Sequence, residues 1–200
     1  MASSTSPDFS AGASPVGSGK IVIAGGFGVG KTTCVASISE IEPVNTEAWM
    51  TAASETVDHL DPGTGKTTTT VAMDFGRITI DPELVLYLFG TPGQARFLPM
   101  WDDICRGAIG ALVIVDTNRL AESFAAVNYF EFDTTVPFVV GVNVFNGTLQ
   151  HAPQQVRQAL ALPDRVPLIT FDARDRSSVA RALLAVVDHA IAQAPATAGV

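Results

Sequence analysis

The stretch Gly25-Gly-Phe-Gly-Val-Gly-Lys31-Thr32 decides the fold of this chain. It satisfies the pattern G-x-x-x-x-G-K-S/T, which is specific when a buried strand precedes it and a helix follows. Both conditions hold, because Lys20-Ile-Val-Ile-Ala24 is typical of a buried strand, and residues 31–39 are typical of a helix. Glycines let backbone N–H groups approach an anion, and a helix N-terminus favours negative charge. The stretch therefore predicts a phosphate-binding loop rather than a glycine-rich turn with a chance lysine.

Each part of this loop has an expected task. Lys31 is expected to reach the β- and γ-phosphates of a nucleoside triphosphate, and the hydroxyl of Thr32 to ligate Mg²⁺. The loop residues expected to contact the nucleotide are Gly26, Phe27, Gly28, Val29, Gly30, Lys31, Thr32 and Thr33. A second, partial match at residues 61–67 has Leu60 where the first glycine belongs and no buried strand before it. We interpret it as a connector, in which Lys66 is a candidate for contact with phosphate or a partner.

Composition narrows the class of protein. Hydrophobic residues make up 47% of the 200 residues, enough for a real core, and the net charge is -8. Nucleic acids and anionic lipids require clusters of Lys and Arg, so neither is expected as a primary partner. No segment reaches the roughly 18 consecutive apolar residues that span a membrane. We expect a cytoplasmic protein with reduced thiols and no direct membrane insertion.

Alternating apolar strands and amphipathic segments predict an α/β fold. We expect tails at residues 1–19 and 193–200 and one domain from 20 to 192. The connector at residues 41–69 shows no clear periodicity, and residues 118–132 read as one helix. The expected strands are 20–24, 70–80, 84–89, 109–115, 137–142 and 167–171. The prediction is a mostly parallel six-stranded sheet with helices on both faces and ligands at the carboxyl ends of its strands.

Three further segments follow in a fixed order: Thr67-Thr-Thr-Thr70, Leu88-Phe-Gly-Thr-Pro-Gly93-Gln94 and Gly141-Val-Asn143-Val-Phe-Asn146. Together with the phosphate loop, this order resembles the Ras-like small GTPases, whose fold is a P-loop NTPase fold. The stretch from Thr70 to Gly76 and the second segment are most similar to the actinobacterial conservon GTPases (the D component). These are relatives of the bacterial gliding-polarity GTPases, and the resemblance covers residues 20–191.

The resemblance assigns the switch residues. Thr70 would close on Mg²⁺ and the γ-phosphate, so Thr32 and Thr70 are the expected metal ligands. Gly93 would sense the γ-phosphate through its N–H, and Gln94 would orient the attacking water as the catalytic residue. On the residues alone, the alternative for Thr70 is the start of a strand, and the alternative for Gln94 is an ordinary loop residue.

The resemblance also assigns contacts with the base. Asn143 occupies the first position of the guanine motif and Asn146 the last, although Asn143 could instead be a turn former. The segment 172–174 matches the last guanine-contacting loop, so Asp172, Ala173 and Arg174 are expected at the nucleotide, with the Ala173 N–H facing the base oxygen.

Two departures weaken the match. Gly90 stands where these GTPases have an aspartate that holds Mg²⁺ through water, and Asp74 on the preceding strand is a candidate substitute. Val144 replaces the lysine that covers the base, and Asn146 replaces a carboxylate acceptor with an amide that also donates. The amide would suit xanthine, or would flip to accept from guanine, or another residue fills this role.

The resemblance thus implies a small regulatory GTPase that binds GTP and GDP with Mg²⁺ and hydrolyses GTP slowly, needing a partner. The alternative is a nucleotide-binding scaffold with little hydrolysis or relaxed base specificity. An ATP-using P-loop enzyme that relies on Asp116 is a third reading, although an acid at this strand end is more often structural. By resemblance, the partners would be a roadblock-type regulator and other signalling-complex components, with membrane contact only through them.

Overall fold

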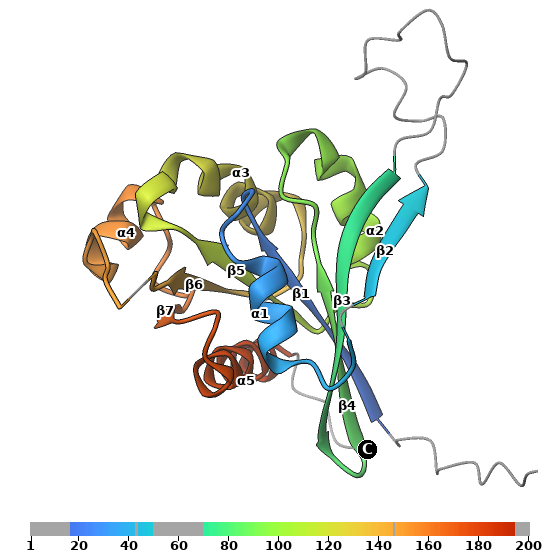
Figure 1. Cartoon of the computed structure of the whole chain (residues 1–200). Helices are drawn as coiled ribbons and strands as arrows, with labels where there is room; N and C mark the ends of the chain where they lie inside the picture. Colours follow the sequence, from blue (N-terminus) through green and yellow to red (C-terminus); the bar gives the residue numbers. More distant parts are fainter. Residues whose placement is uncertain (1–16, 43, 50–69, 146, 195–200) are drawn as a thin grey trace, which may run out of the picture.

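The computed structural model describes residues 17–42, 44–49, 70–145 and 147–194, which form one sheet covered by helices (Figure 1). The sheet has seven strands in the order β2-β3-β4-β1-β5-β6-β7. Their bounds are β1 (Gly17–Gly25), β2 (Val44–Trp49), β3 (Thr70–Asp81), β4 (Leu84–Gly90), β5 (Gly110–Val115), β6 (Phe138–Asn143) and β7 (Leu168–Phe171).

Five of these strands run parallel, because β1 pairs with β4 and β5, and β6 pairs with β5 and β7. A hairpin adds β3 antiparallel to β4, and β2 adds antiparallel to β3. The predicted α/β fold and its six strands are confirmed. The seventh, β2, lies within residues 41–69, where we expected only a connector. Its sequence Val-Asn-Thr-Glu-Ala-Trp has no apolar run, so its pairing with the β3 backbone is a tertiary effect.

The helical segments are α1 (Lys31–Ile38), η2 (Ala95–Met100), α2 (Trp101–Cys105), η3 (Thr117–Ser123), α3 (Phe124–Asn128), η4 (Tyr129–Asp133), α4 (Pro153–Ala159) and α5 (Arg176–Gln193). The single helix expected over 118–132 is therefore three consecutive segments of different pitch. Arg119 has φ -138° and ψ 47°, which breaks the first of them. Asp116 caps this segment by accepting from the N–H of Asn118 at 2.8 Å.

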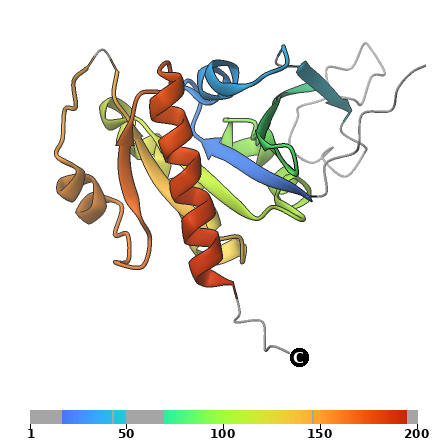
Figure 2. The same cartoon turned by 90° about the horizontal axis from the view of Figure 1, so that it is seen from below.

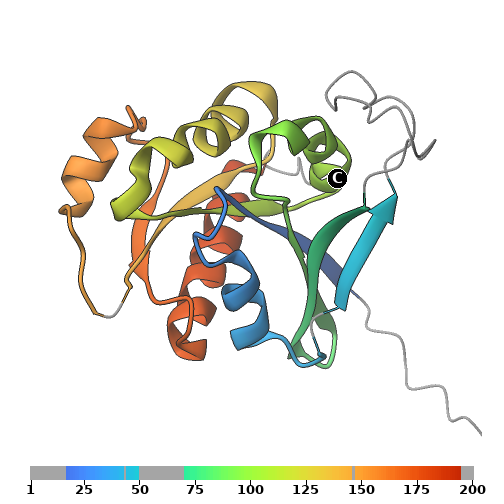
Figure 3. The ribbon, with the colours of Figure 1, turned by 45° about the horizontal axis from the view of Figure 1, so that its top comes forward.

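Two apolar cores lie on opposite faces of the sheet. Successive side chains of the central strands point to opposite faces, so each strand contributes residues to both cores. On β1, Val22 and Ala24 face one core while Ile21 and Ile23 face the other, and all four are fully buried. Helices α1 and α5 lie side by side over one face (Figure 2). Helices α2, α3 and α4 cover the other face (Figure 3). No helix in the described part of the chain is both long and apolar enough to cross a membrane.

The topology brings the carboxyl ends of the five parallel strands to one edge of the sheet. The phosphate loop follows β1, residues 91–94 follow β4, and residues 172–174 follow β7. Asn143 is the last residue of β6. Segments far apart in the sequence therefore meet at the edge where ligands of such sheets bind.

Candidate nucleotide-binding site

The phosphate loop has the backbone that only glycine adopts without strain. Gly25, Gly28 and Gly30 have φ of 140°, 71° and 105°, all in the left-handed region. A Cβ on Gly25 would lie 2.4 Å from the carbonyl oxygen of Ile114, so the loop also passes too close to β5 for any side chain. Val29 is fully buried beneath the loop and anchors it to the core. The loop is therefore held in shape by the sheet below it.

Lys31 is the first residue of α1 and the buried cation of the site, 8% exposed. Its ammonium donates to the carbonyl oxygens of Gly25 at 3.0 Å and Gly26 at 2.6 Å. Burial lowers its pKa from 10.5 to about 8, and the nearby charge of Asp74 acts in the opposite direction. The ammonium is thus positioned inside the loop in the place where phosphate oxygens would bind.

The next two residues of α1, Thr32 and Thr33, are exposed at the mouth of the loop. The hydroxyl of Thr32 donates to Oδ2 of Asp74, a buried residue of β3, at 2.7 Å. The sequence named Asp74 only as a candidate to replace the missing aspartate at position 90, and the structure brings it to Thr32. Phe27, at the tip of the loop, is 66% exposed.

The segment after β4 lies against the phosphate loop. A Cβ on Gly93 would be 2.6 Å from the Lys31 ammonium and 2.8 Å from the carbonyl oxygen of Gly26. Gln94 follows, exposed, and is the N-cap residue of η2. Both line a cavity of about 40 Å³ together with Gly26 and Glu122. The structure therefore places the expected γ-phosphate sensor and catalytic residue beside the loop.

Trp101, which follows this segment, packs inward rather than outward. It is 3% exposed, and its indole N–H donates to the carbonyl oxygen of Pro92 at 3.3 Å. Its ring stacks edge-on against Tyr129, with centroids 5.2 Å apart. The start of α2 is thus anchored in the core next to the site.

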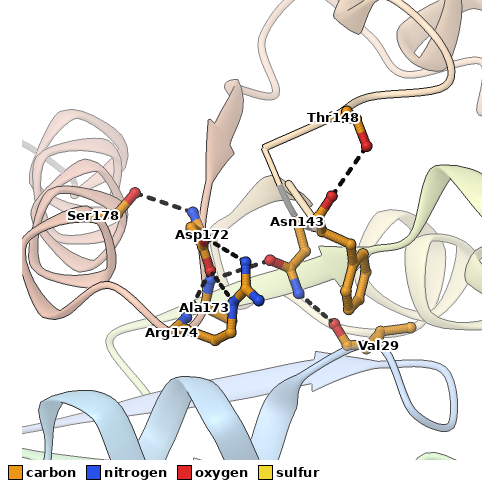
Figure 4. A network of polar contacts seen from close by, with 8 residues as sticks. Val29, Asn143, Thr148, Asp172, Ala173, Arg174 and Ser178 are labelled. Carbon is orange, nitrogen blue, oxygen red and sulfur yellow. Dashed lines mark hydrogen bonds and ion pairs between the residues drawn. The ribbon is translucent and has the colours of Figure 1, made fainter.

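Asn143 joins two loops of the site (Figure 4). Its side chain, 3% exposed, donates from Nδ2 to the carbonyl oxygen of Val29 at 2.9 Å and accepts at Oδ1 from the N–H of Ala173 at 3.1 Å. The N–H of Ala173, which the resemblance expects to face the base oxygen, donates to Asn143 in this structure, and Ala173 is 1% exposed. Asn143 is a bridge, not a turn former that bonds its own backbone.

Asp172 and Arg174 form a compact pair at the rim of the site (Figure 4). The Asp172 carboxylate accepts from the backbone N–H of Arg174 at 2.9 Å and from its guanidinium at 3.1 and 2.9 Å. These hydrogen bonds hold the pKa of Asp172 below its ordinary value. Its own backbone N–H donates to the hydroxyl of Ser178 at 3.1 Å, which ties the loop to α5.

Two expected site residues are not placed. Asn146 and the side chain of Thr70 lie outside the described residues, although Thr70 is the first residue of β3. Val144 is half-buried, and its N–H donates to the carbonyl oxygen of Phe171 at 2.8 Å. The structure therefore assembles the phosphate end of the site, whereas part of the base-contacting motif stays a prediction.

Sequence reasoning missed Arg119, which lies against the phosphate loop. Its Nη2 is 3.0 Å from the place where a Cβ on Gly28 would be. Asp116 holds its Nε at 3.2 Å, and Glu122 lies 3.6 Å from its Nη1. Asp116 thus serves as a helix cap and an arginine anchor, which is the structural role that the sequence favours for it. The signal in the sequence that could have indicated this contact is an aspartate directly after a buried strand, followed three residues later by an arginine.

The fold is similar to those of several solved structures. The cytosolic domain of the T. maritima FeoB iron transporter in apo form is 13% identical, with a TM-score of 0.61, over 90% of this chain and 66% of that chain. The G domain of the same transporter is 14% identical, with a TM-score of 0.60, over 87% and 99%. The cytosolic domain of L. pneumophila FeoB is 14% identical, with a TM-score of 0.57, over 82% and 68%. At these identities the similarity shows the fold.

Sequence comparison supplies the family. No curated protein matches the chain. A family model described as a conserved hypothetical ATP binding protein matches residues 23–193, which include the phosphate loop, Asn143 and nearly all of the sheet. The chain, with the fold of a P-loop GTPase G domain, therefore belongs to the family of conserved hypothetical ATP binding proteins.

Proposed function

We propose that this protein binds GTP and GDP with Mg²⁺ and hydrolyses GTP slowly, as a signalling switch that a partner controls. The observation that carries the proposal is that the start of α1 and the segment after β4 meet at the phosphate loop. Lys31 and Thr32 begin α1. Gly93, which follows β4, packs so closely against Lys31 that a Cβ at position 93 would lie 2.6 Å from the Lys31 ammonium. A site in which the segment after β4 touches the phosphate-binding lysine can change its structure when a γ-phosphate is added or removed.

The oxygen donors at the mouth of the loop fit Mg²⁺. This ion prefers a few protein oxygens together with substrate phosphates. The Thr32 hydroxyl and the Asp74 carboxylate supply such oxygens, and the described residues hold no group of three or more His, Cys, Asp or Glu side chains that would form a complete protein cage. Bound there, the ion would neutralise phosphate charge, while Lys31 and the loop N–H groups orient the phosphates.

Guanine is proposed from the resemblance to Ras-like GTPases and from Asn143. The second candidate is a nucleotide scaffold with relaxed base specificity or little hydrolysis. It is favoured by Val144, which cannot cover a base as a lysine would, and by the engaged N–H of Ala173. The description of the family names ATP, so an adenine nucleotide is a further candidate ligand.

Calorimetry with GTP, GDP, ATP and xanthosine triphosphate, each with and without Mg²⁺, separates these candidates. We expect GTP and GDP to bind at least roughly tenfold more tightly than ATP, and all binding to be lost in Lys31→Ala. Equal affinity for ATP would replace guanine specificity with the relaxed alternative. Absence of binding by every nucleotide would reject the proposal.

Single-turnover hydrolysis tests the switch. We expect slow conversion of bound GTP, and Gln94→Leu to slow it by roughly a hundredfold while GTP affinity stays unchanged. Unchanged hydrolysis in Gln94→Leu would support the scaffold instead. A wild-type rate typical of fast enzymes, with no partner added, would contradict the need for a partner.

The partner is proposed by resemblance to be a roadblock-type regulator within a signalling complex of conservon type, through which the protein would reach the membrane. The residues after Gly93 are the proposed contact, because η2 and α2 directly follow the segment that touches Lys31. Co-purification of this chain with such a regulator in the presence of GTP, and not of GDP, would test the proposal.

A further inference from the structure

Next to the phosphate loop, strand β3 carries a carboxylate, and its partner strand β4 ends in a glycine. Gly90 ends β4 at the position where the resembling GTPases carry an aspartate, and Asp74 lies beside it on β3. The register pairs Phe75 with Phe89, so the next pair along the two antiparallel strands is Asp74 and Gly90. The cross-strand neighbour of Gly90 is thus a carboxylate, on the strand next to the one where the resembling GTPases carry theirs.

The space beside Thr32 admits a side chain from only one of these two positions. A Cβ on Gly90 would lie 2.9 Å from the Cβ of Asp74, which is closer than real Cβ atoms approach other atoms, and a tight 3.0 Å from its Oδ2. Gly90 is not in the left-handed region, so its backbone would accept an aspartate. Space and like charge, rather than backbone conformation, therefore exclude a second carboxylate while Asp74 is present.

The Asp74 carboxylate is engaged with the residue that would ligate the metal. Its Oδ2 accepts from the Thr32 hydroxyl at 2.7 Å, and the residue is 9% exposed. A buried carboxylate is costly unless charges or hydrogen bonds compensate it, and here the Lys31 ammonium and the Thr32 hydroxyl do so. Carboxylates that hold a ligating group in orientation raise metal affinity through that group or through a bound water.

We propose that Asp74 is the carboxylate that holds Mg²⁺ at this site, reaching from β3 into the place that an aspartate at position 90 would otherwise fill. The inference rests on the proposed function, because the metal accompanies a bound nucleotide. On this proposal a chain with Gly90 can still hold Mg²⁺, because a carboxylate oxygen comes from Asp74 on the neighbouring strand β3.

The test is the Mg²⁺ dependence of the release of a fluorescent GDP analogue, with and without a chelator. In the wild type, chelation should accelerate release. In Asp74→Asn, which keeps the shape and removes the charge, the Mg²⁺ concentration for half-maximal retention should rise by about tenfold to a hundredfold. Binding of Mn²⁺ to the GDP complex, followed by electron paramagnetic resonance, should weaken in parallel and does not depend on hydrolysis.

Asp81→Asn is the matched control, since it makes the same change on the same strand, seven residues away at the hairpin end, and should leave Mg²⁺ dependence unchanged. The double variant Asp74→Gly with Gly90→Asp should restore Mg²⁺ dependence to within a few-fold of wild type. Thermal melting confirms that each variant is folded.

The possible outcomes separate failure of the proposed function from failure of the assignment of Asp74. If the wild type binds no GDP, the proposed function itself fails. If the wild type binds GDP in a Mg²⁺-dependent manner and Asp74→Asn does so equally, the assignment of Asp74 is wrong and the proposed function stands. A folded double variant that does not recover Mg²⁺ dependence would also overturn the assignment.

Discussion

At the scale of single residues, the buried ammonium of Lys31 makes the site sensitive to pH. Burial lowers its pKa to about 8, and only the charged form attracts phosphate. We expect the affinity for GDP to fall by roughly tenfold between about pH 7 and about pH 9. Calorimetry at both pH values measures this, and an affinity that stays constant would contradict the assigned role of Lys31.

The same pKa has the opposite effect on folding. The folded pKa of Lys31, about 8, lies below its ordinary value of 10.5, so the unfolded chain binds more protons between these values. The contribution of Lys31 to the free energy of unfolding therefore becomes more favourable as pH rises through this window. The melting temperature of nucleotide-free wild type minus that of nucleotide-free Lys31→Met isolates that contribution. We expect this difference to change in favour of the wild type as pH rises from about 8 to about 10.5.

Gly93 tests how closely the segment after β4 must approach the loop. In Gly93→Ala the new Cβ would meet the carbonyl oxygen of Gly26 at 2.8 Å, and backbone cannot move aside cheaply. We expect hydrolysis of bound GTP to fall by about tenfold to a hundredfold, because a displaced segment misplaces Gln94. The control is Gly17→Ala, whose Cβ would have ordinary contacts of 3.5 Å or more. Equal rates in both variants would refute this account.

At the scale of secondary-structure elements, Asn143 links the end of β6 to the phosphate loop and to the loop between β7 and α5. Asn143→Ala would leave the Val29 carbonyl and the Ala173 N–H without these partners. We expect a loss of about 2–3 kcal/mol in the free energy of unfolding, and a melting temperature lower by about 5–10 °C. Asn118→Ala, an exposed change at the start of η3, should cost less than about 1 kcal/mol. Similar melting of the two variants would mean that the bridge has no structural role.

Some secondary-structure elements could be predicted from the local sequence, and others could not. The strands 109–115 and 137–142 were predicted closely because residues buried on both faces produce continuous apolar runs. The helix expected over 118–132 was wrong in its continuity, since Asp116 and Arg119 bond each other in a way that no periodicity indicates. Strand β2 was missed because its pairing depends on backbone groups of β3, which are the same for every sequence.

At the scale of the whole molecule, ligand binding should stabilise the assembled sheet edge. The site joins segments that follow β1, β4 and β7, so a nucleotide that contacts them binds the native state and not the unfolded chain. GDP with Mg²⁺ at about a hundred times its Kd should add about 2.7 kcal/mol, which raises the melting temperature by roughly 5–10 °C. Thermal melting with GDP, before and after removal of Mg²⁺ by a chelator, measures the shift. A shift that persists unchanged in Lys31→Ala would not come from this site.

The phosphate loop, the α/β class and the order of the motifs could be predicted from the amino-acid sequence, because each depends on residues that are near neighbours in the chain. Left-handed glycines, a lysine at a helix start and apolar strands all leave local patterns. The residues that complete the site are identified by the folded structure alone. Asp74 reaches Thr32 across 42 positions, and Asn143 reaches Val29 across 114. Such contacts arise from strand order and register, which bring together side chains whose separation in the sequence carries no periodic signal.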